Sequence, residues 1–535
     1  MNKTLLACAL AVASVAAIGT AQAATIIPVN MNAAGVGLND PTPAVPVGNN
    51  PGKTVGEQRQ IVYQFAADLW GAVLESDVDI RVRAQFTPLA CEAASGVLGS
   101  AGARFIQRDF EGAVPATWYG EALANAIAGE NLSPTEDEIN SNFNSNLGTP
   151  GCLENSGWYY GLDGNTPAGR INFLDVVMHE IGHGLNFQGF HNLTTGAPQS
   201  GFTDIYSSFV YDNATSKAWN AMTNAERVAA AKSDALVWTG DEVTSQVPDA
   251  LGPLVRLFVS GGLTAQYDYG TAAFGATPTP ANFSGAIVLV NDGSPTNASQ
   301  GCVASPAGAY AGKVALVDRG TCAFEIKANH AQNAGAIAVI VANNVEAIAG
   351  MAEDPSVNAT VPTIMVALSA GNAIKTVLPN ANAALQAVPG SFAGSDTQGR
   401  ARLYSPAVLA TGSTFSHFDV SHAPNALMEP SINQDLDGNL RLDLTPALYS
   451  DMGWTLNQGN AATRNGRCDT GVPVFDADVI GLVGGANLQA AAAMCSSTIK
   501  NKAGLASCLA PFVAKLRSVG AIPASAEASL RKCSL

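Results

Sequence analysis

The sequence predicts an α+β fold in which one domain is interrupted by a β-rich domain and followed by a small helical segment. The chain of 535 residues is too long for a single hydrophobic core. Its 53 glycines and 28 prolines favour loops and β structure over long helices. At about 283–393 short apolar strands alternate with turns, whereas the flanking stretches mix helices, strands and polar loops.

Charge and the first residues indicate the compartment and exclude some partners. A net charge of -16 and a pI near 4.7 argue against nucleic acids and anionic membranes. Lys3 precedes an apolar run at 5–18 and the triplet Ala-Gln-Ala at 21–23. This pattern predicts a cleaved signal peptide over 1–23 and hence a secreted protein. No later run of about 20 apolar residues follows, so we expect no membrane contact after cleavage. The eight cysteines beyond the signal peptide predict disulfides.

The stretch after a Pro-, Gly- and Asn-rich lead-in predicts a helix followed by strands. Residues 58–74 carry apolar side chains at helical spacing, and residues 78–86 alternate apolar and polar side chains as a half-buried strand does. Residues 139–147 are predicted to form a polar strand at a sheet edge. Cys91 and Cys152 could bracket the middle of this region as one disulfide.

A second predicted helix carries the pattern HExxH. Asn172 is a good N-cap, and Asp175 three residues later completes a pair like a capping box. His179 and His183 are four residues apart and therefore share one helix face, from which both imidazoles can bind one metal ion. Glu180 can reach a water on that ion without being a ligand. Two neutral imidazoles and a carboxylate base are typical of zinc hydrolases.

Catalytic zinc takes a third protein ligand, and the sequence offers several. His191 follows the helix closely, and His417 and His422 come more than 200 residues later. A carboxylate on a second helix is the other option, for which Glu226 is the candidate. We favour His417, because its segment Thr-Phe-Ser-His-Phe-Asp is followed by Asn-Ala-Leu-Met-Glu-Pro, which places Met428 in a turn.

These two motifs resemble the leishmanolysin-like metzincins, in which HExxH, a long insertion, a late histidine, a Met-turn and a closing helix follow in this order. The resemblance implies a metzincin-like catalytic domain with a twisted sheet and an active-site helix. We interpret Met428 as a packed platform under the metal rather than a ligand, because a thioether is a poor match for catalytic zinc. The family usually has Gly where Asn186 stands here, at a sharp turn out of the helix. Asn tolerates positive φ, so we expect the turn to be kept. The matching positions are His179, Glu180, His183, His417 and Met428.

The interrupting block resembles the protease-associated (PA) domain. The run GKVALVDRGTCAFEIKANHAQNAGAIAVIVANN contains the strand, the RGxCxF turn, the following helix and the next apolar strand of such domains. The resemblance implies a disulfide between Cys302 and Cys322 and a non-catalytic lid or substrate-access module. His330 lies on the helix of this block, and we interpret it as a surface or packing residue.

The last segment and one acidic loop are less informative. Four cysteines at 468, 495, 508 and 533 allow three disulfide pairings, and the sequence does not choose among them. Asp435, Asp437 and Asp443 hint at calcium, although an exposed turn is the favoured interpretation because the full loop pattern is missing. The predicted parts are a signal peptide (1–23), a split catalytic domain (24–265 and 396–457), an inserted PA domain (266–395) and a helical Cys-containing segment (458–535).

The sequence thus predicts a secreted zinc metalloendopeptidase with one catalytic zinc ion and protein or peptide substrates. Glu180 would act as the general base on a zinc-activated water. Two alternatives stay open: a metal-binding surface or interaction protein without proteolytic activity, and a zinc hydrolase of a non-peptide amide.

Overall fold

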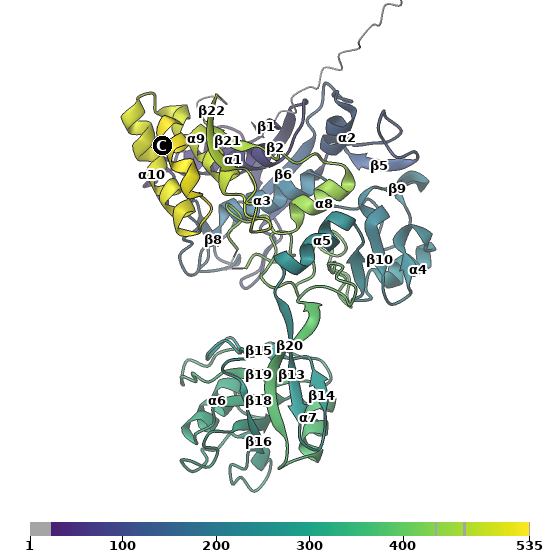
Figure 1. The fold of residues 1–535 in the computed structure, drawn as a ribbon, viewed down its shortest axis with the longest axis vertical. Helices are drawn as coiled ribbons and strands as arrows, with labels where there is room; N and C mark the ends of the chain where they lie inside the picture. The colour runs from purple at the N-terminus through teal and green to yellow at the C-terminus, as the bar shows by residue number, and fades with distance from the viewer. Residues whose placement is uncertain (1–22, 434–435, 464–466, 534–535) are drawn as a thin grey trace, which may run out of the picture. The chain divides into compact units, whose positions relative to one another are not determined.

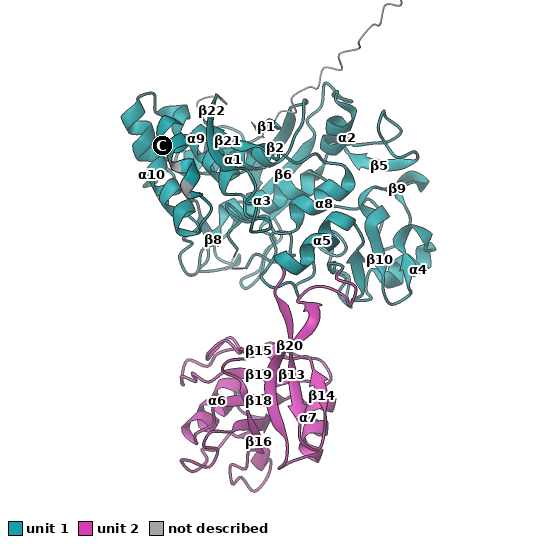
Figure 2. Cartoon of the chain, viewed as in Figure 1, with its two compact units in different colours: residues 1–250, 400–535 teal, residues 251–399 magenta. Residues whose placement is uncertain are grey.

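The computed structural model describes residues 23–433, 436–463 and 467–533. All of the predicted signal peptide except Ala23 lies outside these residues. The chain forms two compact units (Figure 2): unit 1 combines residues 1–250 and 400–535, and unit 2 consists of residues 251–399. Unit 1 is therefore assembled from two distant parts of the sequence.

A four-stranded mixed sheet forms the base of unit 1. Its strands are β1 (Ile26–Asn30), β2 (Ile80–Thr87), β3 (Gly99–Ala103) and β6 (Ile139–Asn144). Their order is β1-β2-β6-β3, in which β1, β2 and β6 run parallel and β3 runs antiparallel to β6 along one edge. The edge strand β3 also packs against α3.

The polar strand was predicted at a sheet edge, and this prediction is wrong, since β6 lies between β2 and β3. The interior position is tolerated because its polar groups have partners. The buried Ser141 hydroxyl lies 2.6 Å from the Tyr63 hydroxyl and donates a hydrogen bond of 2.8 Å to the Arg83 carbonyl. Sequence alternation alone cannot show such partners.

Helices α1 (Val55–Val73) and α3 (Phe173–Gly184) pack against this sheet, and α8 (Thr445–Met452) packs beside them through Tyr449 (Figure 1). The predicted N-cap of α3 is present, because the Asn172 side chain accepts a hydrogen bond from the Leu174 N–H at 2.9 Å. Three side chains from neighbouring segments donate hydrogen bonds to carbonyls of the α3 segment, which fixes this helix from several sides. They are Trp70 to Met178, Tyr449 to Gly182 and Trp454 to Leu185.

Short elements complete the first part of unit 1. Two small sheets have the strand orders β4-β5-β9 and β11-β10-β12, and β7 pairs with β8. The bounds are β4 (Ile106–Gln107), β5 (Thr117–Gly120), α2 (Glu121–Ala128), β7 (Trp158–Tyr159), β8 (Ile171–Asn172), β9 (Thr203–Asp204), β10 (Val210–Asp212), β11 (Lys217–Ala218), α4 (Asn224–Ala230), β12 (Leu236–Trp238) and α5 (Asp241–Ala250).

Unit 2 is an eight-stranded sheet with helices α6 (Phe324–Asn333) and α7 (Leu368–Thr376). Along β17 (Val314–Asp318) successive residues belong alternately to two apolar clusters, one on each face of the sheet. The strand order is β14-β13-β20-β16-β17-β18-β19-β15. The other bounds are β13 (Pro253–Ser260), β14 (Ala265–Tyr267), β15 (Gly270–Thr271), β16 (Ser284–Leu289), β18 (Ala338–Ala342), β19 (Thr363–Val366) and β20 (Asn382–Phe392).

The compact unit begins earlier in the chain than the inserted domain predicted at 266–395. β13 pairs with β20 in antiparallel register from Ser260↔Asn382 to Pro253↔Phe392. The predicted start at 266 lies inside the unit, after its first strand β13. A long-range strand pair of this kind has no local sequence signal.

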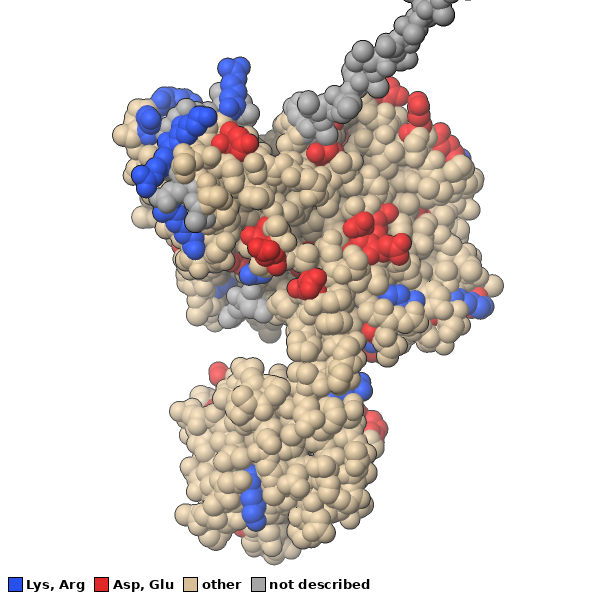
Figure 3. Space-filling model, in the orientation of Figure 1, with Lys and Arg blue, Asp and Glu red and all other residues tan. Residues whose placement is uncertain are grey.

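The C-terminal segment of unit 1 packs its helix α9 against α1. Its elements are β21 (Asn460–Thr463), β22 (Cys468–Pro473), α9 (Gly484–Thr498), α10 (Lys502–Ser518) and α11 (Glu527–Cys533). Disulfides join Cys468 to Cys533 and Cys495 to Cys508, which settles the pairing that the sequence left open. On the face shown in Figure 3, Lys and Arg side chains gather over these C-terminal helices.

The two other predicted disulfides are present. Cys91 is bonded to Cys152 in unit 1, and Cys302 is bonded to Cys322 in unit 2. Four disulfides are compatible with an oxidising compartment. Among the described residues, no helix combines the length and the apolar character that crossing a bilayer requires.

Candidate metal centre

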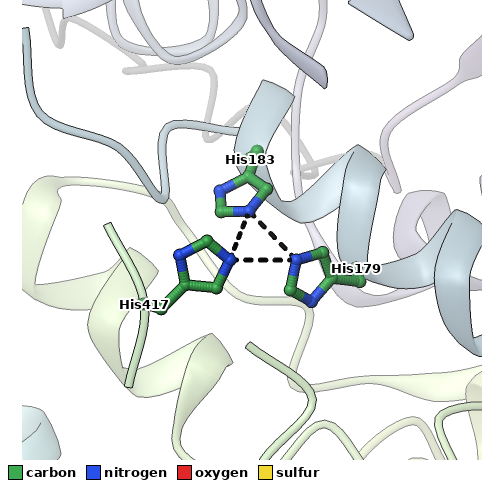
Figure 4. A group of neighbouring side chains, drawn as sticks. All are labelled: His179, His183 and His417. Atoms are coloured by element: carbon green, nitrogen blue, oxygen red, sulfur yellow. Dashed lines mark hydrogen bonds between the residues drawn. The ribbon is translucent and has the colours of Figure 1, made fainter. Parts of the chain in front are cut away.

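Three histidines from two distant segments meet in unit 1 (Figure 4). His179 and His183 project from one side of α3, and His417 comes from the segment between β20 and α8. The Nε2 atom of His183 lies 3.1 Å from that of His179 and 3.2 Å from that of His417, and the third Nε2 pair is also 3.2 Å apart. All three side chains are buried.

The other ring nitrogen of each histidine faces a backbone carbonyl. His179 Nδ1 lies 2.7 Å from the Leu427 oxygen, His183 Nδ1 lies 2.8 Å from the Phe187 oxygen, and His417 Nδ1 lies 2.8 Å from the Ser413 oxygen. A carbonyl only accepts hydrogen bonds, so each Nδ1 carries the proton in the neutral ring. The three Nε2 atoms then have lone pairs and no hydrogen, and all three lone pairs point to one place.

Burial keeps these rings neutral. It lowers the pKa of His179 to about 4, and burial together with the neighbouring His179 lowers the pKa of His183 to about 3. Burial also holds the pKa of His417 well below its usual range. Neutral imidazole is the form that binds zinc, and tetrahedral zinc with Zn–N bonds of about 2.0–2.1 Å needs nitrogens about 3.3 Å apart. The observed Nε2 separations therefore fit a zinc ion.

Glu180 lies next to this group and against the edge strand β3. A Cβ atom added to Gly99 would lie 2.6 Å from Glu180 Oε1, so only glycine leaves room for the carboxylate. Burial raises the pKa of Glu180 to about 8, and a hydrogen bond from the Ala101 N–H opposes this shift. A bound divalent cation would favour the carboxylate form. The sequence did not single out Gly99, although the small-residue run Gly-Ser-Ala-Gly-Ala at 99–103 is a signal of close approach.

Met428 packs beneath α3. A Cβ atom on Gly182 would lie 2.8 Å from Met428 Sδ, so the glycine lets the thioether approach the helix. The preceding residue, Leu427, supplies the carbonyl that orients His179. The turn at Met428 thus both supports the helix and fixes one ring.

Asn186 adopts the positive φ that we expected at the exit of the helix, with φ of 91°. Its side-chain oxygen accepts a hydrogen bond of 2.5 Å from the Gly120 N–H. Next to it, Phe187 supplies the carbonyl that orients His183. The sharp turn therefore positions the Phe187 carbonyl that orients His183.

The other candidate ligands lie outside this group. His191 Nδ1 is 3.0 Å from the buried Asp204 carboxylate, His422 Nε2 faces the Arg402 carbonyl, and Glu226 caps the N-terminus of α4. His330 is half-buried and bonds to the Gly301 carbonyl in unit 2. Among the described residues, His179, His183 and His417 are the one group of three or more His, Cys, Asp or Glu side chains able to share an ion.

Among the described residues, nothing supports the calcium site hinted at by three aspartates. Asp435 lies outside the described residues. The Asp443 carboxylate accepts hydrogen bonds from the Leu427 N–H at 2.6 Å and from Thr445. Asp437 does not belong to any group of three metal-ligating side chains in the described chain. The loop is also less exposed than expected, because Gly438 and Asn439 are buried.

The histidines line a cleft of about 930 Å³. Its other lining residues include 96–101, 411–413 and 429–432. The Leu98 carbonyl accepts a hydrogen bond from the Asn144 N–H, and the Arg104 N–H donates one to the Glu138 carbonyl. Backbone hydrogen bonding alternates along an antiparallel strand pair, so the backbone groups of Gly99 and Ala101 point away from β6. In the described chain β3 thus lacks a strand neighbour on that side.

The comparison with family models finds one domain. Residues 289–374 match the model of the PA domain. Unit 2 contains a PA domain. The resemblance drawn from the RGxCxF turn and the following helix is thereby confirmed, and the match covers a minor part of the chain.

Two curated proteins of Arabidopsis thaliana match over short stretches. Signal peptide peptidase-like 3 is 41% identical over 78 residues, which is 14% of this chain and 14% of that protein. Signal peptide peptidase-like 5 is 40% identical over 65 residues, 12% of each chain. Because the matches span about one seventh of these relatives or less, their activities are not transferred to this chain.

Solved structures match with low scores. A zinc aminopeptidase of Bacillus subtilis is 20% identical, covers 28% of this chain and 37% of its own, and has a TM-score of 0.18. The aminopeptidase of Aneurinibacillus sp. strain AM-1 is 18% identical over 27% of this chain and 37% of its own, with a TM-score of 0.19. Scores of this size do not establish the fold of unit 1, so its metzincin-like character stays a prediction.

Proposed function

We propose that this protein is a secreted, zinc-dependent endopeptidase of metzincin-like architecture. The observation that carries the proposal is the convergence of three buried Nε2 lone pairs beside a carboxylate that lines the same cleft. His179, His183 and His417 would hold the ion. Bound there, zinc would supply a Lewis acid and bring the pKa of a water molecule to about 7.

The residues of the chain have separate tasks in peptide hydrolysis. Glu180 removes a proton from the attacking water and passes it to the leaving amine. The carbonyls of Leu427, Phe187 and Ser413 hold the imidazoles in the one tautomer that can bind a metal. Met428 packs against α3 and so fixes the separation between this helix and the turn that carries Leu427.

The edge strand β3 supports a peptide as the substrate. An extended chain placed in the cleft can pair with the outward backbone groups of Gly99 and with the Ala101 carbonyl, as strands add to open sheet edges. This pairing would pass the scissile carbonyl close to Glu180, because the Glu180 carboxylate occupies the space that a Cβ atom at Gly99 would need. Backbone pairing reads no particular side chain, so we expect cleavage within proteins of different sequence.

The test compares Glu180→Ala with Glu226→Ala, a control on the exposed end of α4. We expect Glu180→Ala to lower the rate of casein digestion by about 10²–10⁴-fold because the general base is lost. Its zinc content, measured by inductively coupled plasma mass spectrometry, should stay at one ion per chain. Glu226→Ala should match the wild type in both measurements. Wild-type digestion rates in Glu180→Ala would overturn the mechanism, and zinc without any peptide cleavage in the wild type would favour a metal-binding interaction protein.

A further inference from the structure

Unit 1 contains a second cavity, of about 270 Å³, between α1, α9 and the N-terminal segment that carries β1. Helices α1 and α9 pack against each other beside it (Figure 1). Among the described residues, none lines both this cavity and the histidine cleft. The cavity is therefore a separate place in the fold, at which the C-terminal segment meets the rest of unit 1.

The floor of this cavity is apolar. Leu38, Phe65 and Met494 line it and are buried. Pro28 and Ile61, which are half-buried, also line it. Contact with such side chains favours a ligand with an apolar body, because apolar surface of the ligand is then removed from water.

Asp68 of α1 adds a carboxylate to the cavity and is half-buried. Its Oδ1 atom accepts a hydrogen bond of 2.8 Å from the Gln64 side-chain amide, and its Oδ2 atom has no hydrogen-bond donor among the described residues. The described residues that line the cavity include no Lys, Arg or His. Burial raises the pKa of Asp68 to about 6. Above that pH the cavity holds a carboxylate to which the described chain supplies no cation.

We propose that this cavity binds a small organic cation, whose ammonium or guanidinium group pairs with Asp68 and whose apolar body covers Phe65 and Met494. A cation that donates to a carboxylate forms a strong hydrogen bond, and a half-buried pair is screened less by salt than an exposed one. The volume leaves room for about nine non-hydrogen atoms at about 30 Å³ each. Such a group can belong to a free amine or to a Lys or Arg side chain of a peptide.

A ligand in this cavity would contact two helices that are far apart in the sequence. Asp68 and Phe65 belong to α1, whereas Met494 belongs to α9. A ligand that binds only the folded state stabilises that state, so binding would strengthen the packing of the C-terminal segment on α1. The proposal does not depend on the proposed peptidase activity, since the cavity and the histidine cleft are separate.

The test titrates two amines into the zinc-loaded protein at about pH 8, where amines are protonated and Asp68 is ionised, by isothermal titration calorimetry. Phenethylamine is a free amine, and Nα-acetyl-lysine amide carries its ammonium as a peptide side chain does. We expect at least one of them to bind at one site per chain with a Kd of about 0.1–1 mM. The neutral counterparts, phenethyl alcohol and Nα-acetyl-norleucine amide, should bind at least about 10-fold more weakly because they form no ion pair. The amine that binds more tightly indicates the source of the cation.

Two pairs of variants locate the site. Asp68→Asn removes the charge and should weaken amine binding at least about 10-fold, while Asp77→Asn, on the exposed loop after α1, should keep the wild-type Kd. Ala493→Phe places a large side chain at the exposed rim of the cavity and should abolish binding. Ala510→Phe, at an exposed position of α10 outside the cavity, should leave binding unchanged. The alanine pair decides if Asp68→Asn does not fold.

Three results would overturn the proposal. The first is that the wild type binds neither amine up to about 10 mM. The second is that Asp68→Asn or Ala493→Phe keeps the wild-type Kd. The third is that an amine and its neutral counterpart bind equally well, because the carboxylate would then contribute nothing to recognition.

Discussion

Unit 2 packs apolar clusters on both faces of its sheet and buries a few charged side chains, Asp292, Glu325 and Lys327, whereas unit 1 gathers buried histidine and acidic side chains around one cleft. The clusters on the two faces of the unit 2 sheet consist of aliphatic and aromatic residues and methionine, and its fully buried cation is Lys327. Unit 1 buries His179, His183 and His417 within a few ångströms of one another, and the buried Glu180 lines the same cleft. Burying polar groups destabilises a fold unless they have partners, so the arrangement in unit 1 indicates a site kept for binding or chemistry.

The largest effect is expected from removing one histidine of the metal centre. His417→Ala leaves two imidazoles, and the zinc affinity should fall by more than about 100-fold, since even residues that only support ligands contribute 10–100-fold. Casein digestion should fall with the zinc content. The measurements are zinc per chain after dialysis and the digestion rate at fixed protein concentration.

His191→Ala is the matched control. This side chain is also buried, and it contacts Asp204 instead of the metal group. We expect the variant to keep one zinc ion per chain. The assignment of the third ligand would fail if His191→Ala lost zinc and His417→Ala retained it.

Lys327 offers a test of the apolar interior of unit 2. Its ammonium donates a hydrogen bond of 2.9 Å to the Gln300 carbonyl and lies 3.4 and 3.3 Å from the sulfurs of Cys302 and Cys322. Burial lowers its pKa from 10.5 to about 8. Between pH 8 and 10.5 the unfolded chain therefore binds more protons than the folded one, and stability rises with pH.

Lys327→Met should remove this pH dependence. Relative to the variant, the wild type should gain about 3 kcal/mol between pH 8 and 10.5, measured by urea unfolding across the range. Lys313→Met changes an exposed lysine of the same unit and should follow the wild type. Parallel pH profiles for wild type and Lys327→Met would show that the buried ammonium is not destabilising.

Features that depend on local sequence patterns were predicted more completely than features that depend on long-range contacts. The pair His179 and His183 follows from the four-residue spacing of one helix, and the PA domain from one continuous run. The position of His417 beside His183 followed only from a family resemblance, because no residue near it in the chain indicates a contact with a helix more than 200 residues away. The interior position of β6 depends on Tyr63 and Arg83, which no pattern within the strand reveals.

The close approach of Gly99 to Glu180 is another long-range contact that the sequence did not reveal. Its variant has the smallest expected effect. A Cβ atom there would meet Glu180 Oε1 at 2.6 Å, so Gly99→Ala should push the carboxylate away from its position. We expect digestion to slow by about 10–100-fold, because small displacements of catalytic groups have effects of this size, with zinc content unchanged. Ser100→Ala, the next residue along the strand, should have little effect because successive side chains point to opposite faces. A fully active Gly99→Ala would show that the carboxylate can work from a shifted position, and the close approach of β3 would then be a packing feature rather than part of the site.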